Sequence, residues 1–249
     1  MSERLTSSVS IVIRARNEES SLKRLLPILE QQTVPHEVVL VDNASTDATR
    51  KLAIDHGAKV VDIAEDEFSY PKASNVGIRA SNGDHVVMLS AHSFPRRPDW
   101  LETGLSHLDD PEVAGVYAKP ITRRDSETSN TDKVFSYLGA AYLLTQKVRR
   151  DTKFVPSYGQ MGSTNALFRG NLLRETPFDE QRGSGGEDVA WAREMLENGF
   201  TIVRDPNFAV YHSHALGPRG WLQQYKEWGK VLGEPTKFNR QDIAYRRKD

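Results

Sequence analysis

The first ninety residues alternate short apolar runs with amphipathic stripes, and this alternation restricts the fold more than any other feature. The expected strands are residues 8–14, 38–41, 59–63 and 85–89, and the expected helices are 19–32, 48–56 and 72–80. Strands separated by helices in this rhythm indicate a mostly parallel α/β sheet with helices on both faces. Ligands bind such sheets at the carboxyl ends of the strands, so the polar residues after Ile13, Val41 and Leu89 are the first site candidates.

The composition excludes several classes of protein. Lys and Arg total 33 against 34 Asp and Glu, and this balance argues against a nucleic-acid-binding protein, which usually carries a basic excess. The chain has no cysteine, so disulfides and thiolate zinc sites are absent. Residues 1–6 hold no apolar signal core, and no stretch approaches the roughly 20 apolar residues that span a bilayer. We therefore expect a cytoplasmic protein without a transmembrane segment.

One apolar and aromatic stretch, residues 134–148, stands out in the less regular second half and is followed by Arg149 and Arg150. It is too short to span a membrane. Two interpretations stay open: a core or acceptor-cleft helix, or a segment that lies on a membrane surface.

Acidic residues occur at two positions where chemistry is expected. Asp42 directly follows an apolar strand, where it either shapes the turn or accepts a hydrogen bond from a nucleotide base or ribose. Glu187 and Asp188 open a helical pattern, where acids also favour the helix dipole. Taken alone, the pair is better explained by helix capping. Gly183, Gly185 and Gly186 just before it permit close approach of a ligand to the backbone, which shifts the balance toward a site.

Two histidines, His212 and His214, lie two residues apart after the next apolar run. On a strand they would share one face, as two metal ligands can. A pair of this kind has a structural interpretation as well, so the histidines alone do not decide the function.

Read in order, these segments resemble family 2 glycosyltransferases with the GT-A fold. Residues 10–18 (Ser-Ile-Val-Ile-Arg-Ala-Arg-Asn-Glu) and 38–47 (Val-Val-Leu-Val-Asp-Asn-Ala-Ser-Thr-Asp) are similar to the family's opening strand and its Val-Asp-Asp/Asn-Gly-Ser-Thr-Asp turn. Residues 73–78 followed by Gly83-Asp84 are similar to its Asn-x-Gly helix. Residues 186–188 match its Glu-Asp acceptor motif, and residues 211–214 match its late histidine element.

The resemblance covers roughly residues 8–232, and its last part is most similar to bacterial rhamnosyltransferase-type members. It implies a single GT-A (Rossmann-like) domain with a C-terminal helical extension. Within that domain, residues 8–118 would form the nucleotide-sugar-binding half and residues 119–232 the acceptor half, with a tail at 233–249. The implied reaction moves a sugar from a nucleoside-diphosphate donor to an acceptor hydroxyl with inversion, in glycan, polysaccharide or glycosylated-metabolite biosynthesis.

Site residues follow from the same resemblance. Asp188 is the expected general base, and Glu187 is expected to orient the acceptor. The expected donor-binding residues are Arg14, Arg16, Glu18, Asp42, Lys72, Asn75, Ser90 and Ala91. The planar guanidinium of Arg14 or Arg16 could stack on the base.

The chain departs from the family at the metal motif, where Ser90-Ala91-His92 replaces the usual Asp-x-Asp. A neutral imidazole binds divalent cations, so His92, with His212 or His214 as its partner, is expected to hold Mn²⁺ or Mg²⁺. The rival hypothesis is metal-free transfer, in which Lys72, Arg16 or histidines offset the charge of the diphosphate.

The expected donors are UDP-, dTDP- or GDP-linked sugars, and the acceptor is a carbohydrate, a lipid-linked molecule or a small molecule. Peripheral contact with the inner face of the membrane stays open. Two other classes also stay open: a non-catalytic nucleotide-sugar-binding protein, because Ser90 replaces an acid, and a sugar nucleotidyltransferase. Residues 14–19 contain no glycine, which argues against the phosphate loop of the latter.

Overall fold

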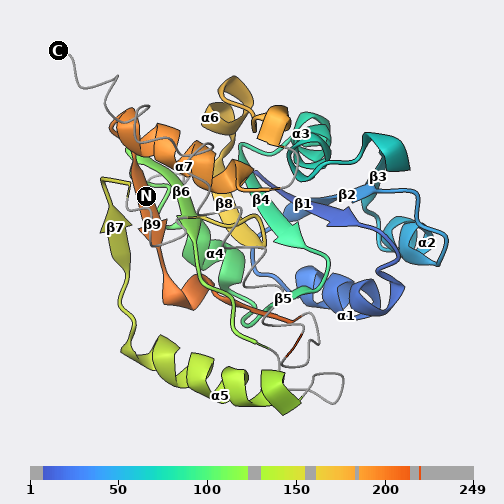
Figure 1. Ribbon diagram of the computed structural model, residues 1–249, viewed down its shortest axis with the longest axis horizontal. Helices are drawn as coiled ribbons and strands as arrows, with labels where there is room; N and C mark the ends of the chain where they lie inside the picture. The colour runs from blue at the N-terminus through green and yellow to red at the C-terminus, as the bar shows by residue number, and fades with distance from the viewer. Residues whose placement is uncertain (1–7, 123–129, 155–160, 183–184, 214–218, 220–249) are drawn as a thin grey trace, which may run out of the picture.

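The computed structural model describes residues 8–122, 130–154, 161–182, 185–213 and 219 (Figure 1). Within these residues an eight-stranded sheet has the order β3-β2-β1-β4-β8-β6-β9-β7. Its strands are β1 (Val9–Ala15), β2 (His36–Asp42), β3 (Lys59–Asp62), β4 (His85–Ser90), β6 (Val113–Tyr117), β7 (Arg149–Asp151), β8 (Asn165–Arg169) and β9 (Thr201–Arg204). A separate two-stranded sheet pairs β5 (Ser93–Pro95) with β10 (Val210–His212).

Seven α-helices and three 3₁₀ turns are assigned in the described ranges. The α-helices are α1 (Glu19–Glu30), α2 (Thr49–Asp55), α3 (Tyr70–Ala80), α4 (Trp100–Leu105), α5 (Asn130–Thr145), α6 (Gly170–Glu175) and α7 (Glu187–Glu197). The 3₁₀ turns are η1 (Glu65–Glu67), η3 (Glu180–Arg182) and η4 (Pro206–Phe208). The elements expected in the first ninety residues are all present, with small shifts of their ends.

The sheet is parallel in its first half and mixed in its second. β2, β1 and β4 run parallel to one another, and β3 runs parallel to β2. β8 then runs antiparallel to both β4 and β6, while β9 is parallel to β6. The prediction of a mostly parallel central sheet with flanking helices is confirmed, and the antiparallel strands belong to the segment expected to be less regular.

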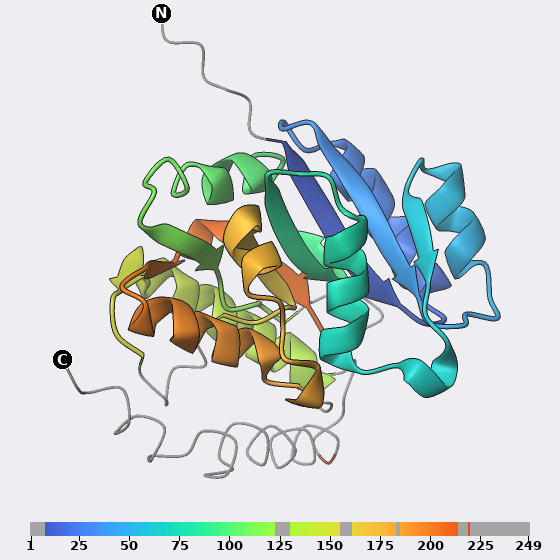
Figure 2. The ribbon, with the colours of Figure 1, turned by 90° about the horizontal axis from the view of Figure 1, so that it is seen from above.

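Each face of the sheet is covered by its own helices (Figures 1 and 2). Ile11 and Ile13 of β1 belong to the apolar cluster that includes residues of α1, α2 and α4, whereas Val12 belongs to the cluster with α3, α6 and α7. β1 is therefore buried on both faces, which explains its continuous apolar sequence. Gly77 of α3 is required by close packing, because a Cβ there would lie 2.2 Å from Cγ1 of Val12.

The register of the parallel strands gathers the expected site residues at one edge of the sheet, the edge formed by the carboxyl ends of these strands. Arg14 pairs with Ser90, and Ala15 pairs with Asp42, so the carboxyl ends of β1, β2 and β4 lie side by side. β8 begins at the same edge, where Asn165 pairs with Leu89. This edge is where the sequence predicts a ligand site.

The apolar segment after residue 130 forms α5, and the structure corrects its expected role. Val134, Leu138 and Leu144 are exposed to solvent rather than packed inside. The interpretation of this segment as a core helix is therefore wrong for these three side chains. No helix among the described residues is long and apolar enough to cross a membrane.

Candidate active site

The acidic pair sits at the start of α7, where the chain makes a left-handed turn. Gly185 and Gly186 have φ values of 116° and 83°. Backbone of this kind strains any residue with a Cβ, so both glycines are needed for the turn itself. A Cβ on Gly185 would meet only Oε2 of Glu187, at an ordinary 3.9 Å, so crowding is not the reason for glycine there. The turn directs Glu187 and Asp188 into different surroundings.

Glu187 is buried and faces Arg14 of β1. Its side chain is 3% exposed, and Nη1 of Arg14 lies 3.3 Å from its Oε1. Burial raises the pKa of Glu187 to about 7; the negative charge of Asp188 adds to the rise, and the positive charge of Arg14 opposes it. Glu187 is therefore poised to exchange a proton near neutral pH.

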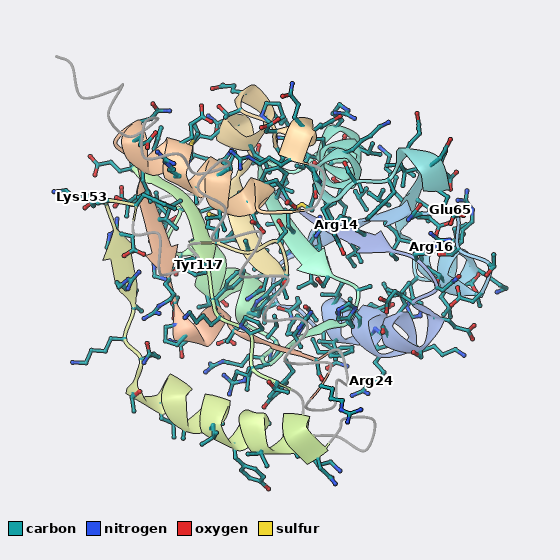
Figure 3. The ribbon with its side chains drawn as sticks, in the orientation of Figure 1. Arg14, Arg16, Arg24, Glu65, Tyr117 and Lys153 are labelled. Atoms are coloured by element: carbon teal, nitrogen blue, oxygen red, sulfur yellow. The ribbon has the colours of Figure 1, made fainter. Side chains whose placement is uncertain are left out.

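Arg14 is held in place by the first turns of α3. Its Nη1 donates to the carbonyl oxygen of Tyr70 at 3.1 Å and to the hydroxyl of Ser74 at 3.0 Å. The guanidinium carbon also lies 5.1 Å from the centre of the Tyr70 ring. Figure 3 shows Arg14 among these elements at the edge of the sheet. These contacts hold against α3 one of the two guanidinium groups expected to stack on a base, and the Glu187 ion pair joins Arg14 to α7.

Asp188 is half-buried and lies beside the end of β4. Its Oδ2 accepts a hydrogen bond from the backbone N–H of Ser163 at 2.6 Å, and its Oδ1 accepts one from Val189 at 2.7 Å. The next residue, Thr164, accepts a hydrogen bond from the backbone N–H of Ser90 through its carbonyl oxygen at 3.2 Å. A short path of backbone contacts therefore fixes Asp188 relative to Ser90.

Asp42 ends β2 at the same edge of the sheet. It is buried, and among the described residues its Oδ1 has no hydrogen-bond partner. Its Oδ2 lies 4.0 Å from Nη1 of Arg50. A buried carboxylate oxygen without a donor is unfavourable. An N–H or O–H group of a ligand would offset that penalty.

The loops that follow β1 and β2 brace each other through residues of the two opening motifs. Oδ1 of Asn17 accepts from the backbone N–H of Thr46 at 2.8 Å, and the backbone N–H of Asn17 donates to Ser45 at 2.9 Å. The backbone N–H of Glu18 donates to Oγ1 of Thr49 at 2.7 Å. These contacts therefore fix the two loops that border the carboxyl ends of β1 and β2.

Two cations expected near the diphosphate are paired with the acidic turn η1. Nη2 of Arg16 lies 2.5 Å from Oε1 of Glu65 (Figure 3). Nζ of Lys72 lies 3.3 Å from Oε1 of Glu67. Exposed pairs of this kind contribute roughly 0–1 kcal/mol each, so an incoming anion could replace the glutamates.

His92 and His212 come together although they are 120 residues apart. His212 pairs with Ser93 in the small sheet, and the centres of the His92 and His212 rings lie 4.7 Å apart. Nδ1 of His92 lies 3.0 Å from Oε1 of Glu18. A carboxylate that accepts from one ring nitrogen leaves the lone pair on the other, which is the usual support of a metal-binding histidine. His214 lies outside the described residues.

Asn75 has a structural position that the sequence did not predict. Its Nδ2 donates to the carbonyl of Phe178 at 2.8 Å and to Oε1 of Glu180 at 2.9 Å, and its Oδ1 accepts from the backbone N–H of Phe178 at 3.1 Å. Both amide hydrogens are used, so Asn75 ties α3 to the segment before α7. The side chain of Ala91 is buried, so only its backbone is left to contact a nucleotide-sugar donor.

Sequence reasoning did not identify the residues that hold Asp188 and Arg14 in place. Ser163 donates to Asp188, while Tyr70 and Ser74 hold Arg14. Ser163 acts through its backbone, which leaves no signal in the sequence. Ser74 lies in the expected helix 72–80 and Tyr70 lies just before it, but nothing in their identity predicts an arginine partner.

A cavity of about 890 Å³ lies at the opposite edge of the sheet, the edge formed by the amino ends of the parallel strands. It is lined by the first residues of three strands, Val9, His36 and His85, among others. None of the predicted site residues lines it, so it takes no part in the arrangement described above.

Solved structures with the same architecture include glycosyltransferases of the GT-A fold. The mannosyltransferase PcManGT from Pyrobaculum calidifontis, in complex with GDP-Man and Mn²⁺, has a TM-score of 0.66 and 20% identity; the match covers 92% of this chain and 63% of that one. S. aureus TarS has a TM-score of 0.64 and 16% identity, covering 97% of this chain and 75% of that one. At these identities the likeness establishes the fold.

The family is established by sequence. A family model described as glycosyl transferase family 2 matches residues 10–173, so the chain belongs to this family and is a glycosyltransferase. The predictions of family, fold and enzyme class are confirmed.

Curated relatives include two bacterial rhamnosyltransferases. The O-antigen chain rhamnosyltransferase WbaN of Salmonella anatum is 24% identical over 233 residues, covering 87% of this chain and 73% of the relative. RfbN of Salmonella typhimurium, of the same description, is 20% identical over 259 residues, covering 95% and 81%. The pre-mycofactocin glycosyltransferase of Mycobacterium tuberculosis is 29% identical, and the match spans only 46% of its length.

Proposed function

We propose that the protein transfers a sugar from a nucleoside-diphosphate donor to an acceptor hydroxyl with inversion, and that Asp188 is the general base. The observation that carries this proposal is the position of Asp188. It is the half-buried member of the acidic pair, and the backbone N–H of Ser163 holds it beside the end of β4. Glu187, the other member, is buried against Arg14.

In the proposed step the acceptor hydroxyl gives its proton to the carboxylate of Asp188 while its oxygen attacks the anomeric carbon of the donor. The bond from that carbon to the diphosphate oxygen breaks, and the nucleoside diphosphate leaves with the electron pair. A positioned base of this kind contributes typically ~10²–10⁴-fold to the rate. A single displacement inverts the anomeric configuration.

Glu187 supports this step indirectly. Its burial makes direct contact with an acceptor difficult, so we propose that it positions the start of α7 rather than orienting the acceptor itself. Its ion pair with Arg14 connects the base to β1 and α3, which form part of the proposed donor half. A positioning role of this kind depends on the charge of Arg14 as well as on the carboxyl group.

The donor is proposed to bind along the edge formed by Asp42, Ser90 and the backbone of Ala91. The buried Oδ1 of Asp42 would accept from a base N–H or a ribose hydroxyl. Arg16 and Lys72 would move from their η1 glutamates to the diphosphate. Solved relatives hold GDP-Man, UDP or UDP-GlcNAc, which supports a nucleotide sugar but leaves the choice among UDP-, dTDP- and GDP-linked donors as a proposal.

A divalent cation, Mn²⁺ or Mg²⁺, is proposed to accompany the donor. The neighbouring His92 and His212 rings supply ligand nitrogens, and the Glu18 contact to Nδ1 suits a metal-binding tautomer of His92. No cluster of three or more such ligands is found among the described residues, so diphosphate oxygens and water would complete the shell. When bound, the cation offsets negative charge on the leaving diphosphate.

The acceptor is proposed to be a carbohydrate or a lipid-linked glycan, since two relatives are named O-antigen chain rhamnosyltransferases. A small-molecule acceptor is the alternative, supported by the relative named for pre-mycofactocin. A peripheral location at the inner face of the membrane fits a lipid-linked acceptor.

The direct test is release of nucleoside diphosphate from a panel of UDP-, dTDP- and GDP-sugars, with and without EDTA. We expect release from one nucleotide class and its loss in EDTA. Donor binding without any release would favour a non-catalytic nucleotide-sugar-binding protein. Release of pyrophosphate from a sugar phosphate and a nucleoside triphosphate would indicate a sugar nucleotidyltransferase, and release unaffected by EDTA would reject the cation.

A further inference from the structure

Helix α5 presents a row of apolar side chains to solvent. Leu144 is 90% exposed, Leu138 is 60% exposed and Val134 is 59% exposed. At 3.6 residues per turn these three positions, with Ala141 between them, fall on one side of the helix. Large exposed apolar surface of this kind marks a site of contact with another molecule or a membrane.

The described inner side of α5 carries small residues instead. Ser136 is buried, and a Cβ on Gly139 would lie 3.4 Å from Cγ2 of Ile121. Figure 1 shows α5 at the margin of the fold, away from the layers of helices that cover the main sheet.

The charges around this row favour an anionic partner. Residues 130–150 contain four basic side chains and one acidic side chain, in a chain whose net charge is −1. Arg149 pairs with Asp151 and Arg150 with Asp110, so Lys133 and Lys147 carry the argument. Lys133 and Lys147 stand near the two ends of the apolar row. Basic groups beside an apolar helix face are the pattern that binds membranes rich in anionic lipids.

The same charges disfavour a second copy of this chain as the partner. In a two-fold dimer the helices meet either antiparallel or parallel. An antiparallel pair would bring Lys133 close to Lys147 of the other copy, and a parallel pair would bring each lysine close to its own equivalent. Both arrangements place like charges together, whereas a bilayer with anionic headgroups offers opposite charge to both ends.

We propose that α5 lies flat on an anionic lipid surface, with Val134, Leu138 and Leu144 inserted between the headgroups. Gly139 of α5 rests on Ile121, which bridges to Tyr211 beside His212. Docking therefore holds the edge with the histidines close to the membrane. The surface is independent of the transfer reaction, so its test needs no knowledge of donor or acceptor.

The test is sedimentation of the full chain with vesicles of phosphatidylcholine alone and of phosphatidylcholine mixed with phosphatidylglycerol. We expect binding to the mixed vesicles, weaker binding at high salt, and little binding to phosphatidylcholine alone. The double variant Leu138→Glu/Leu144→Glu should reduce the partition coefficient by at least ~10-fold, because each buried leucine contributes about that factor. Lys133→Glu/Lys147→Glu should weaken binding and its dependence on salt.

The matched control is Ile54→Glu. Ile54 lies on α2, outside α5, and its side chain is 54% exposed. It should bind vesicles like the wild type, and all variants should keep the wild-type melting temperature within a few degrees. Equal loss in the Ile54 variant, or unchanged binding by the α5 variants, would overturn the proposal. So would absence of binding by the wild type, or a dimer that the Leu138→Glu/Leu144→Glu change dissociates in sedimentation velocity.

Discussion

Arg14 at the end of β1 and Glu187 at the start of α7 form a buried ion pair across 173 positions of sequence, with Nη1 3.3 Å from Oε1. The pair joins the proposed donor edge of the sheet to the helix that carries the proposed base. Burial and the charge of Asp188 raise the pKa of Glu187, and the positive charge of Arg14 opposes that rise and favours the ionised carboxylate.

Removal of Arg14 should therefore be costly, and more so at high pH. Arg14→Met leaves Glu187 buried without its counter-charge, and breaking such a pair costs ~3–5 kcal/mol of unfolding free energy when the remaining group stays charged. Below neutral pH Glu187 can bind a proton, so we expect a smaller loss there. Urea unfolding of the variant at several pH values measures the effect.

The control for this change is the double variant Arg14→Met/Glu187→Gln, which removes both charges. At alkaline pH it should be more stable than Arg14→Met alone. If the single and double variants unfold at the same urea concentration across the pH range, the two side chains are not coupled.

The raised pKa of Glu187 also predicts how stability varies with pH. Its ordinary value is 4.5 and its folded value is about 7, so the folded chain binds more protons than the unfolded chain between these values. The free energy of unfolding contributed by Glu187 therefore falls as pH rises through this window. Over the whole window the change is on the order of 3 kcal/mol.

Glu187→Gln removes this contribution. Its free energy of unfolding, taken relative to the wild type at the same pH, should rise between roughly pH 5 and pH 8. The comparison at equal pH cancels the opposite trend from His85, whose pKa is lowered by burial and by the charge of Arg169. A constant difference between the two proteins would show that Glu187 titrates normally.

The Glu18 contact to His92 predicts a metal phenotype. Glu18→Ala removes the carboxylate that orients the imidazole, and loss of such support typically lowers metal affinity ~10–100-fold. Activity titrated with Mn²⁺ should require correspondingly more metal, and His92→Ala should lose the response altogether. An unchanged Mn²⁺ midpoint in both variants would argue against a cation at His92.

Asp42 should contribute to recognition of the nucleoside rather than the diphosphate. Asp42→Asn replaces a charged acceptor, and loss of one charge-assisted hydrogen bond of about 1.5–3 kcal/mol weakens binding by about tenfold or more. Calorimetry with the preferred nucleoside diphosphate should report this loss, while affinity for inorganic pyrophosphate stays the same. Equal weakening for both ligands would place Asp42 near the phosphates instead.

The parallel half of the fold was predictable because its signals are local. Apolar runs such as 38–41 and the leucine stripe of α1 specify strand and helix without distant information. The same logic placed Asp42 and Ser90 at one edge, since parallel strands share their carboxyl ends. The resemblance to the family added expected roles for the acidic pair and the late histidines.

The contacts of the site were less predictable because they join distant segments. Nothing near Arg14 in sequence indicates that it faces Glu187 rather than a nucleotide base, and Asn75 is satisfied by Phe178, which lies about a hundred residues away. The exposure of α5 was equally unpredictable from the sequence, because an apolar run has the same composition whether it lies in a core or on a surface.

The central claim is tested most directly by Asp188→Asn, compared with Asp109→Asn at the opposite edge of the sheet. An asparagine keeps an oxygen that can accept from Ser163, so the fold and donor binding should be preserved. We expect turnover to fall by at least ~10²-fold, with the affinity for the nucleoside diphosphate unchanged and the Asp109 variant fully active. Near-wild-type turnover in Asp188→Asn would contradict the assignment of the base and, with it, the proposed mechanism.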